Sequence, residues 1–316
     1  RPAFPDRWAA TQHNLATLYA SRMDGERSAN IEQAIHHYQL ALSVYSLAVL
    51  PVEHRQTQRN VGTLCLLEQR WQEAAQAFSA TLAASELLYT AAATPEARQI
   101  ELREVNNISS ALAYALLRHS TQNDDLVQAI LVLERNRARW LAESLALDSE
   151  KPVDVPAVHW QRFTETATQI RQLQAEAQLP DNAPHKRDFL TLSDLLTKAR
   201  ADLTQAIAAI RMYAPEFMPT PSFTDIQAAL IPTDNDEVEM GVYLLSTDQG
   251  GLALLVQSDR IMPIRLDTLT DHLLLTLLRE WFEAYDASLI QRTDKARQQW
   301  HAQIDTVTCH LWAMVM

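Results

Sequence analysis

Three stretches of the chain repeat one arrangement of small and large side chains, and this repetition limits the fold more than any other feature. Each stretch carries a small residue within an apolar helical pattern, at Ala16, Gly62 and Ala111. An alanine follows 18, 12 and 18 positions later, at Ala34, Ala74 and Ala129. Helix pairs that repeat in this way cannot bury their apolar faces alone and must stack on neighbours. We therefore predict stacked helix pairs that approach closely at the small residues and offer a surface to other proteins.

The apolar periodicity of the first 150 residues predicts about six helices. We expect them to pair as 8–23 with 30–50, 54–69 with 72–92, and 96–118 with 124–147. Pro51 and Pro95 mark the breaks between pairs, because proline cannot continue a helix. The chain has only five glycines among 316 residues, which favours long helices with short connections and leaves no glycine-rich phosphate loop.

The pattern changes twice beyond residue 150. Two helical stretches at 159–178 and 186–213 predict a hairpin that connects the repeats to the C-terminal part of the chain and packs partly on the repeats. Short runs rich in Val, Ile and Leu at 238–246, 251–257 and 260–266 then predict an antiparallel meander. Helices are expected again at 268–285 and 294–316. The predicted class is mainly α with a C-terminal α+β part, divided into 1–150, 151–221 and 222–316.

Particular residues in both halves resemble a known family. Asn14-Leu15-Ala16 and Asn30-Ile31-Glu32-Gln33-Ala34 are similar to tetratricopeptide (TPR) repeats of the bacterial kind that precede CHAT domains, with a departure at Cys65, where tyrosine is usual. Gly241-Val242-Tyr243-Leu244-Leu245 and Trp281-Phe282-Glu283-Ala284-Tyr285 resemble the start of a CHAT domain, which has a caspase-like fold. The resemblance implies a TPR-like α-solenoid, a helical connector and the truncated first part of a CHAT domain.

The resemblance implies no catalytic residue in this chain. Intact CHAT domains look like cysteine peptidases with a His and a Cys at strand ends, and neither context occurs before Met316. We expect both residues in a longer parent, because the chain starts at Arg1 and stops within an apolar run. Cys309 and His310 cannot form a pair, since adjacent helix residues point about 100° apart. The sequence favours a buried thiol at Cys309 and a core position for Cys65.

Composition excludes several other classes of function. The net charge of −12 disfavours binding to nucleic acid. No His-Glu-x-x-His motif and no Cys/His quartet suggests a metal site, and no cofactor is expected. No apolar run reaches the roughly 18 residues needed to cross a bilayer. The two distant cysteines are typical of reduced thiols, so we expect a cytoplasmic protein.

The expected functional surface is the groove lined by the first helices of the repeats. In repeats that this chain resembles, the Asn beside the conserved Leu often contacts bound peptide, and Asn14 and Asn60 match that position. His13, Arg59 and Thr63 stand on nearby turns, and an arginine beside asparagines suits a carboxylate or peptide backbone. The alternative is that both asparagines bond backbone groups within the stack. The sequence leaves the two open.

Three functions follow as hypotheses. The chain recognises a protein or peptide partner and relays binding to a downstream caspase-like domain, or it is the regulatory part of an active cysteine peptidase, or it is a structural module that forms homo-oligomers.

A run of arginines within residues 133–143 fits a docking patch, but a solvated helix face with Arg139 paired to Glu143 is the favoured interpretation.

Overall fold

The structure is a computed structural model, and it describes residues 4–92, 95–120, 122–144, 151–179, 183–184, 186–215, 217–218, 221–230, 240–258 and 260–315. The chain is mainly helical, with one small antiparallel sheet in its C-terminal part. It divides into two compact units. The first unit comprises Arg1–Ala115 with Val132–Pro221, and the second comprises Leu116–Leu131 with Ser222–Met316. The predicted division at residues 150 and 221 stays a prediction.

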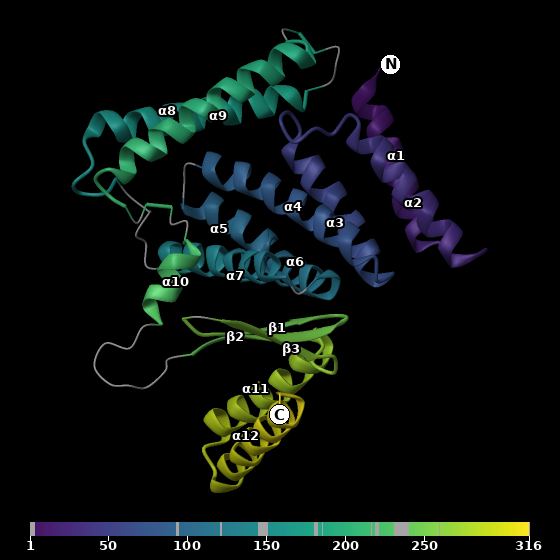
Figure 1. The fold of residues 1–316 in the computed structure, drawn as a ribbon, viewed down its shortest axis with the longest axis vertical. Helices are drawn as coiled ribbons and strands as arrows, with labels where there is room; N and C mark the ends of the chain where they lie inside the picture. Colours follow the sequence, from purple (N-terminus) through teal and green to yellow (C-terminus); the bar gives the residue numbers. More distant parts are fainter. Residues whose placement is uncertain are drawn as a thin grey trace. The chain divides into compact units, whose positions relative to one another are not determined.

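The first unit is built from helix pairs. Its helices are α1 (Pro5–Ser21), α2 (Arg27–Leu42), α3 (Pro51–Leu67), α4 (Trp71–Ala91), α5 (Pro95–Glu104), α8 (Ala157–Ala177), α9 (Phe189–Arg211) and parts of α6 (Asn106–His119) and α7 (Asn123–Ser144). The helix α1 packs on α2, α3 on α4, and α8 on α9, as Figure 1 shows. Proline is the first residue of α1, α3 and α5, where its missing N–H costs no helical hydrogen bond.

The repeated small residues lie in the interior, as the sequence predicts. All six are buried. Gly62 in α3 shows why one of them has no side chain: a Cβ added there would lie 2.6 Å from Cε1 of Phe78 in α4. In the first pair the aromatic residue at the matching position is Tyr38, whose hydroxyl lies 3.1 Å from Oγ1 of Thr17. The paired helices therefore approach each other closely at these positions.

The hairpin of α8 and α9 shares one apolar core with the first helix pairs. Buried side chains of this core include Tyr45 and Val49 before α3, Phe163 and Ile170 in α8, and Leu196 in α9. Removing such side chains from water is the main favourable term in folding. The predicted connector is thus part of the same compact unit as the repeats.

Two predicted helices of the first unit have the wrong extent. The helix predicted at 30–50 ends at Leu42, and turns follow in which the Ser46 hydroxyl accepts from the Val49 N–H at 3.3 Å. The helix predicted at 96–118 is two helices, because the chain turns at Val105, whose carbonyl accepts from the Ile108 N–H at 3.0 Å. Neither break carries a glycine or a proline, so no strong stop signal is present in the sequence there.

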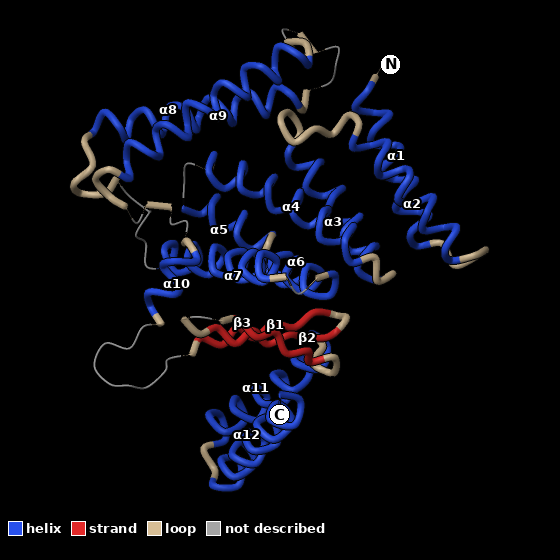
Figure 2. Tube along the Cα trace, in the orientation of Figure 1, coloured by secondary structure: helices blue, strands red, loops and turns tan. Residues whose placement is uncertain are grey.

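The second unit contains the predicted meander. Its strands β1 (Gly241–Thr247), β2 (Gly250–Val256) and β3 (Ile261–Leu266) pair antiparallel in the order β1-β2-β3, drawn in red in Figure 2. The prediction for this sheet is confirmed, although residues 238–239 of the predicted first strand lie outside the described residues. The helices α11 (Asp271–Gln291) and α12 (Asp294–Val315) follow and pack on each other.

Sequence reasoning missed one short helix of this unit, α10 (Phe223–Ala229). Ser222 caps it: the Ser222 hydroxyl accepts from the Asp225 N–H at 3.2 Å, and the Asp225 carboxylate accepts from the Ser222 N–H at 2.9 Å. This reciprocal arrangement is a capping box. The Ser-x-x-Asp spacing is visible in the sequence and would have found the helix.

Arg139 does not lie on a solvated face, so that part of the prediction is wrong. It is buried, and its guanidinium donates to both carboxylate oxygens of Glu86 in α4, at 2.6 and 2.8 Å. It also stacks 4.6 Å from the ring centre of Tyr89. The side chain of Glu143 lies outside the described residues, so its predicted pair with Arg139 stays a prediction. The planar guanidinium of Arg139 matches the two oxygens of the Glu86 carboxylate, which satisfies the charge of this buried side chain.

Substitution of Gly62 tests the close packing of α3 on α4. Gly62→Ala gains about 1 kcal/mol of helix propensity but forces a methyl against Phe78, which costs about 1–3 kcal/mol. We expect no gain in unfolding free energy, measured by urea denaturation. In a Phe78→Leu background, whose shorter side chain can turn away, the same change should stabilise the protein by up to about 1 kcal/mol. A full gain in the wild type would contradict the packing.

The pair of Glu86 and Arg139 predicts a pH dependence. Burial alone would raise the pKa of Glu86, but hydrogen bonds from Arg139 and nearby arginine charges outweigh it and lower the pKa. A lowered pKa gives stabilisation that is present above the unfolded value of about 4.3 and is lost as the pH falls through the folded value. Glu86→Gln should cost about 1–2 kcal/mol at pH 7, since the Glu86 side chain is 36% exposed.

The measurement is urea denaturation of both proteins at several pH values. The stability gap between wild type and Glu86→Gln should close in acid, where Glu86 becomes protonated in the wild type. Glu165→Gln, on the exposed face of α8, is the matched control and should leave stability nearly unchanged at every pH. A gap of constant size down to strong acid would show that the charge of Glu86 does not stabilise the fold.

Candidate functional site

His13 joins the first two helix pairs. Its Nδ1 lies 2.9 Å from Oγ1 of Thr57, whose own hydroxyl donates to the Glu53 carbonyl at 2.8 Å. Because Thr57 has one proton to give, His13 must donate through Nδ1–H. Burial lowers the pKa of His13, and its ring meets that of Tyr38 edge-on at 5.4 Å. Among the predicted site residues, His13 is therefore committed to packing α1 against α2 and α3.

Two arginines of α3 join it to α5. Arg55 pairs with Glu101, and both side chains are mostly buried. One turn further along each helix, Arg59 pairs with Glu104 at 3.6 Å, and here both side chains are about half exposed. The order of the pairs runs the same way along both helices, so α3 and α5 point in the same direction. Exposed pairs like the second contribute little to stability, typically about 0–1 kcal/mol, so Glu104 can be replaced by another carboxylate.

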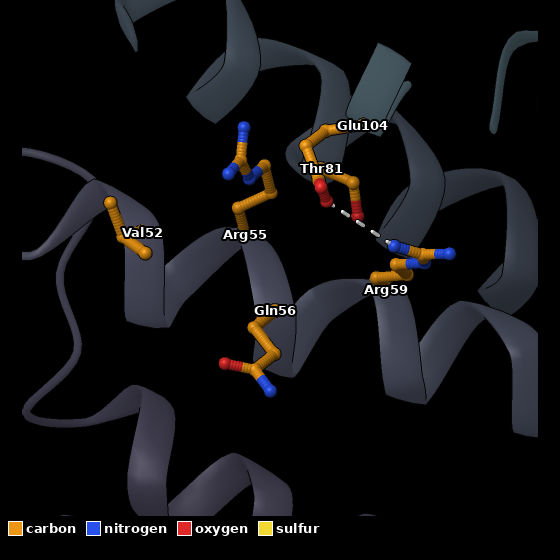
Figure 3. A pocket seen from close by; sticks show the side chains of 6 residues that line it. All are labelled: Val52, Arg55, Gln56, Arg59, Thr81 and Glu104. Carbon is orange, nitrogen blue, oxygen red and sulfur yellow. Dashed lines mark ion pairs between the residues drawn. The ribbon is translucent and has the colours of Figure 1, made fainter. Parts of the chain in front are cut away.

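Arg59 and Glu104 stand where two hollows of the first unit meet. One, of about 270 Å³, is lined by Val52, Arg55, Gln56, Arg59, Thr81 and Glu104 (Figure 3). The other, of about 340 Å³, is lined by Arg59, Arg103, Glu104, Asn107 and Trp140. We call the two together the arginine groove. In Figure 3 the arginines project from successive turns of α3, with Glu104 directed at Arg59.

The arginine groove has the opposite charge to the chain as a whole. Its lining holds three arginines, at 55, 59 and 103, against one glutamate, at 104, and because Glu101 neutralises Arg55 the excess is one positive charge. The whole chain carries −12. Arg103 is exposed and forms no ion pair with any described residue. A basic groove in an acidic protein focuses anionic ligands by electrostatic attraction.

The other predicted binding residues lie outside the groove lining. Asn14 on α1 and Thr63 on α3 are exposed, and Asn60 on α3 is half-buried. Within the described ranges neither asparagine side chain forms a hydrogen bond, which speaks against the alternative that they bond backbone groups of the stack. Of the five predicted residues, the structure brings only Arg59 into the groove.

Sequence reasoning missed most of the groove. On α3, Val52, Arg55 and Gln56 precede Arg59 by seven, four and three positions, which is the spacing of one helix face and was visible. The contributions of Arg103, Asn107 and Trp140 depend on how later helices pack on α3. No local pattern carries that information.

A third hollow, of about 250 Å³, is also charged but differs in kind. Its lining includes Asp6, Lys186, Arg187 and Asp188. Lys186 pairs with Asp6 at 3.5 Å, Arg187 pairs with Glu176, and Asp188 accepts from two backbone N–H groups at the start of α9. The pair of Lys186 and Asp6 joins the α8–α9 hairpin to α1, and the other charges are satisfied within the hairpin. The hollow is therefore a structural contact.

The two cysteines have opposite environments. Cys65 is buried in α3, and burial raises its pKa to about 11, with smaller contributions from nearby charges. Cys309 is exposed, which corrects the expectation of a buried thiol. The reason is that α12 packs on α11 with one face only, and Cys309 stands on the other. The Nδ1 of His310 lies 2.9 Å from the Thr306 carbonyl oxygen, one turn earlier.

The described residues contain no group of three or more His, Cys, Asp or Glu side chains placed to hold a metal ion. None of the described helices is both long enough and apolar enough to span a bilayer. Comparison of the chain with protein-family models, curated proteins and solved structures gives no match. The geometry of the site is therefore the guide to function.

Thiol labelling tests the cysteine environments. In the folded protein, Ellman's reagent at neutral pH should react quickly with one thiol, because Cys309 is exposed and Cys65 is both buried and protonated. Cys309→Ser should abolish the fast phase, and unfolding in urea should expose Cys65. Fast reaction of two thiols in the native state would contradict the buried position of Cys65.

Proposed function

We propose that this chain is a protein-recognition module that binds an acidic peptide segment of a partner in the arginine groove. The observation that carries the proposal is the presence of two exposed groove arginines, Arg59 and Arg103, beside a single groove glutamate in a chain of net charge −12. The neighbouring Asn107 amide can bond a peptide backbone, and the half-buried Trp140 offers an apolar surface. Guanidinium groups bind carboxylates through paired, charge-assisted hydrogen bonds.

In this proposal, the ion pair of Arg59 and Glu104 is replaced by a pair between Arg59 and a carboxylate of the ligand. Because this pair is exposed and 3.6 Å long, an incoming carboxylate can take the place of Glu104 at little cost. Arg55 differs, since its pair with Glu101 is mostly buried and holds α3 to α5. We therefore assign Arg59 and Arg103 to ligand binding and Arg55 to the support of the groove.

The resemblance to TPR and CHAT proteins extends this proposal to a longer parent. The packed helix pairs and the following antiparallel meander support it. In that proposal, partner binding in the groove is relayed to a caspase-like cysteine peptidase domain that follows in the parent. A relay requires two arrangements of the parent that differ in affinity for the partner.

Peptide binding tests the recognition role. The probe is a fluorescein-labelled peptide with alternating Glu and Leu, and its counterpart with Lys in place of Glu is the control ligand. We expect fluorescence anisotropy to show binding of the acidic peptide alone, weakened by salt. Arg59→Ala and Arg103→Ala should each weaken it about tenfold, the equivalent of about 1.4 kcal/mol. Glu104→Gln should strengthen it, because it releases Arg59.

The matched control is Arg162→Ala. Arg162 pairs with Asp202 at 3.8 Å on α8 and α9, with similar exposure to Arg59, but lies outside the groove. Its loss should leave binding unchanged. Equal affinity of the wild type, Arg59→Ala and Glu104→Gln, or equal binding of both peptides, would reject the groove as the recognition site.

A further inference from the structure

The helix α11 carries a row of large apolar side chains on its outer face. Leu275, Phe282 and Leu289 are 60%, 52% and 53% exposed, although each is the kind of side chain that proteins usually bury. They follow one another at intervals of seven residues. Positions seven apart on an α-helix differ by only about 20° in direction, so the three form one stripe along the helix.

The stripe lies opposite the face that α11 uses inside its own unit. Leu277 and Ser288 are the buried residues of α11. At about 100° per residue, both point roughly 120–140° away from Phe282, the middle of the stripe. The helix α12 packs on α11 but leaves the stripe uncovered. Such a seven-residue apolar repeat is the pattern that pairs one helix with another.

Two charged residues lie within this face. Arg279 and Asp286 fall between the apolar positions, are exposed, and form no ion pair with any described residue. Both belong to the same narrow strip of the helix surface as Phe282, since they point within about 60° of it. A charge in the middle of an apolar stripe sets which partner, and which orientation, can cover it.

The order of these residues is self-complementary about Phe282. If two copies of α11 cross antiparallel with their Phe282 side chains together, Leu275 of one copy meets the partner's Leu289. In the same arrangement Arg279 meets the partner's Asp286, twice by symmetry. A parallel arrangement would instead put the charged residues of the two copies on opposite flanks of the contact, because Arg279 and Asp286 both lie to one side of the stripe. The antiparallel arrangement therefore gains two charge pairs that a parallel one lacks.

We propose that α11 is a homodimerisation surface, and that the second copy of this chain covers the stripe in an antiparallel, two-fold symmetric arrangement. The contact is isologous, as in most symmetric dimers. This inference concerns the second unit and does not depend on ligand binding in the arginine groove.

The size of the stripe predicts a weak dimer. From Leu275 to Leu289 it extends about 21 Å at about 1.5 Å per residue. A contact of this length falls at the small end of specific interfaces, where association is reversible and depends on concentration. Glu283 flanks the stripe close to the symmetry axis, where it faces its own counterpart. Glu283→Gln should therefore strengthen the dimer.

Sedimentation velocity of the full 316-residue chain over a wide concentration range is the test. We expect the wild type to pass from monomer to dimer as concentration rises. Phe282→Glu should shift the dissociation constant at least tenfold toward monomer. Arg279→Glu and Asp286→Arg should each do the same, because each leaves like charges opposite one another.

Charge exchange makes the test specific to this geometry. The double variant R279E/D286R restores complementary charges and should dimerise again. Mixing the single variants Arg279→Glu and Asp286→Arg should give a heterodimer, although each alone is monomeric. Circular dichroism checks that every variant keeps its fold, and Thr276→Glu, on the flank of the helix, is the control. A wild type that stays monomeric, or a dimer that none of these changes weakens, would overturn the proposal.

Discussion

The close approach of paired helices at small residues is the constraint that organises the first unit. Gly62 shows it most directly, since any side chain there would collide with the ring of Phe78. Ala16, Ala34 and Ala74 are fully buried for the same reason. Helices that approach this closely leave their outer faces free to meet the next pair. The positions of Arg55 and Arg59 beside α5 follow from that stacking.

The contacts between successive helix pairs are of two kinds: buried contacts that hold the helices together, and half-exposed contacts that remain accessible to a ligand. His13 with Thr57 and Arg55 with Glu101 are largely withdrawn from solvent and fix α3 between α1 and α5. Arg59 and Glu104 are half exposed and form the rim where two hollows meet. Of the two arginines on successive turns of α3, Arg55 therefore holds the helices together, and Arg59 can exchange Glu104 for a carboxylate of a ligand. Pre-organised arginines lose little freedom on binding a carboxylate.

The helix pairs and the β-meander could be predicted from the sequence because both rest on local periodicity and spacing. The break at Val105 and the end of α2 at Leu42 could not, since neither position carries a stop signal. Contacts between residues far apart in the sequence could not be predicted either. Arg139 has an acidic residue four positions later, but its partner is Glu86, 53 residues away. For the groove, the pattern of one helix was enough to predict Arg59. The contributions of Arg103 and Trp140 depend on how three helices pack together.

Recognition by the groove requires that an acidic segment binds at Arg59 and Arg103. An NMR titration that follows the Nε–Hε signals of the arginine side chains, while the acidic peptide is added, observes this binding at the residues themselves. We predict that the signals of Arg59 and Arg103 shift together and saturate, while those of Arg162 and Arg187 on the α8–α9 hairpin stay in place. Equal small shifts of all four, or shifts confined to the hairpin, would contradict binding in the arginine groove.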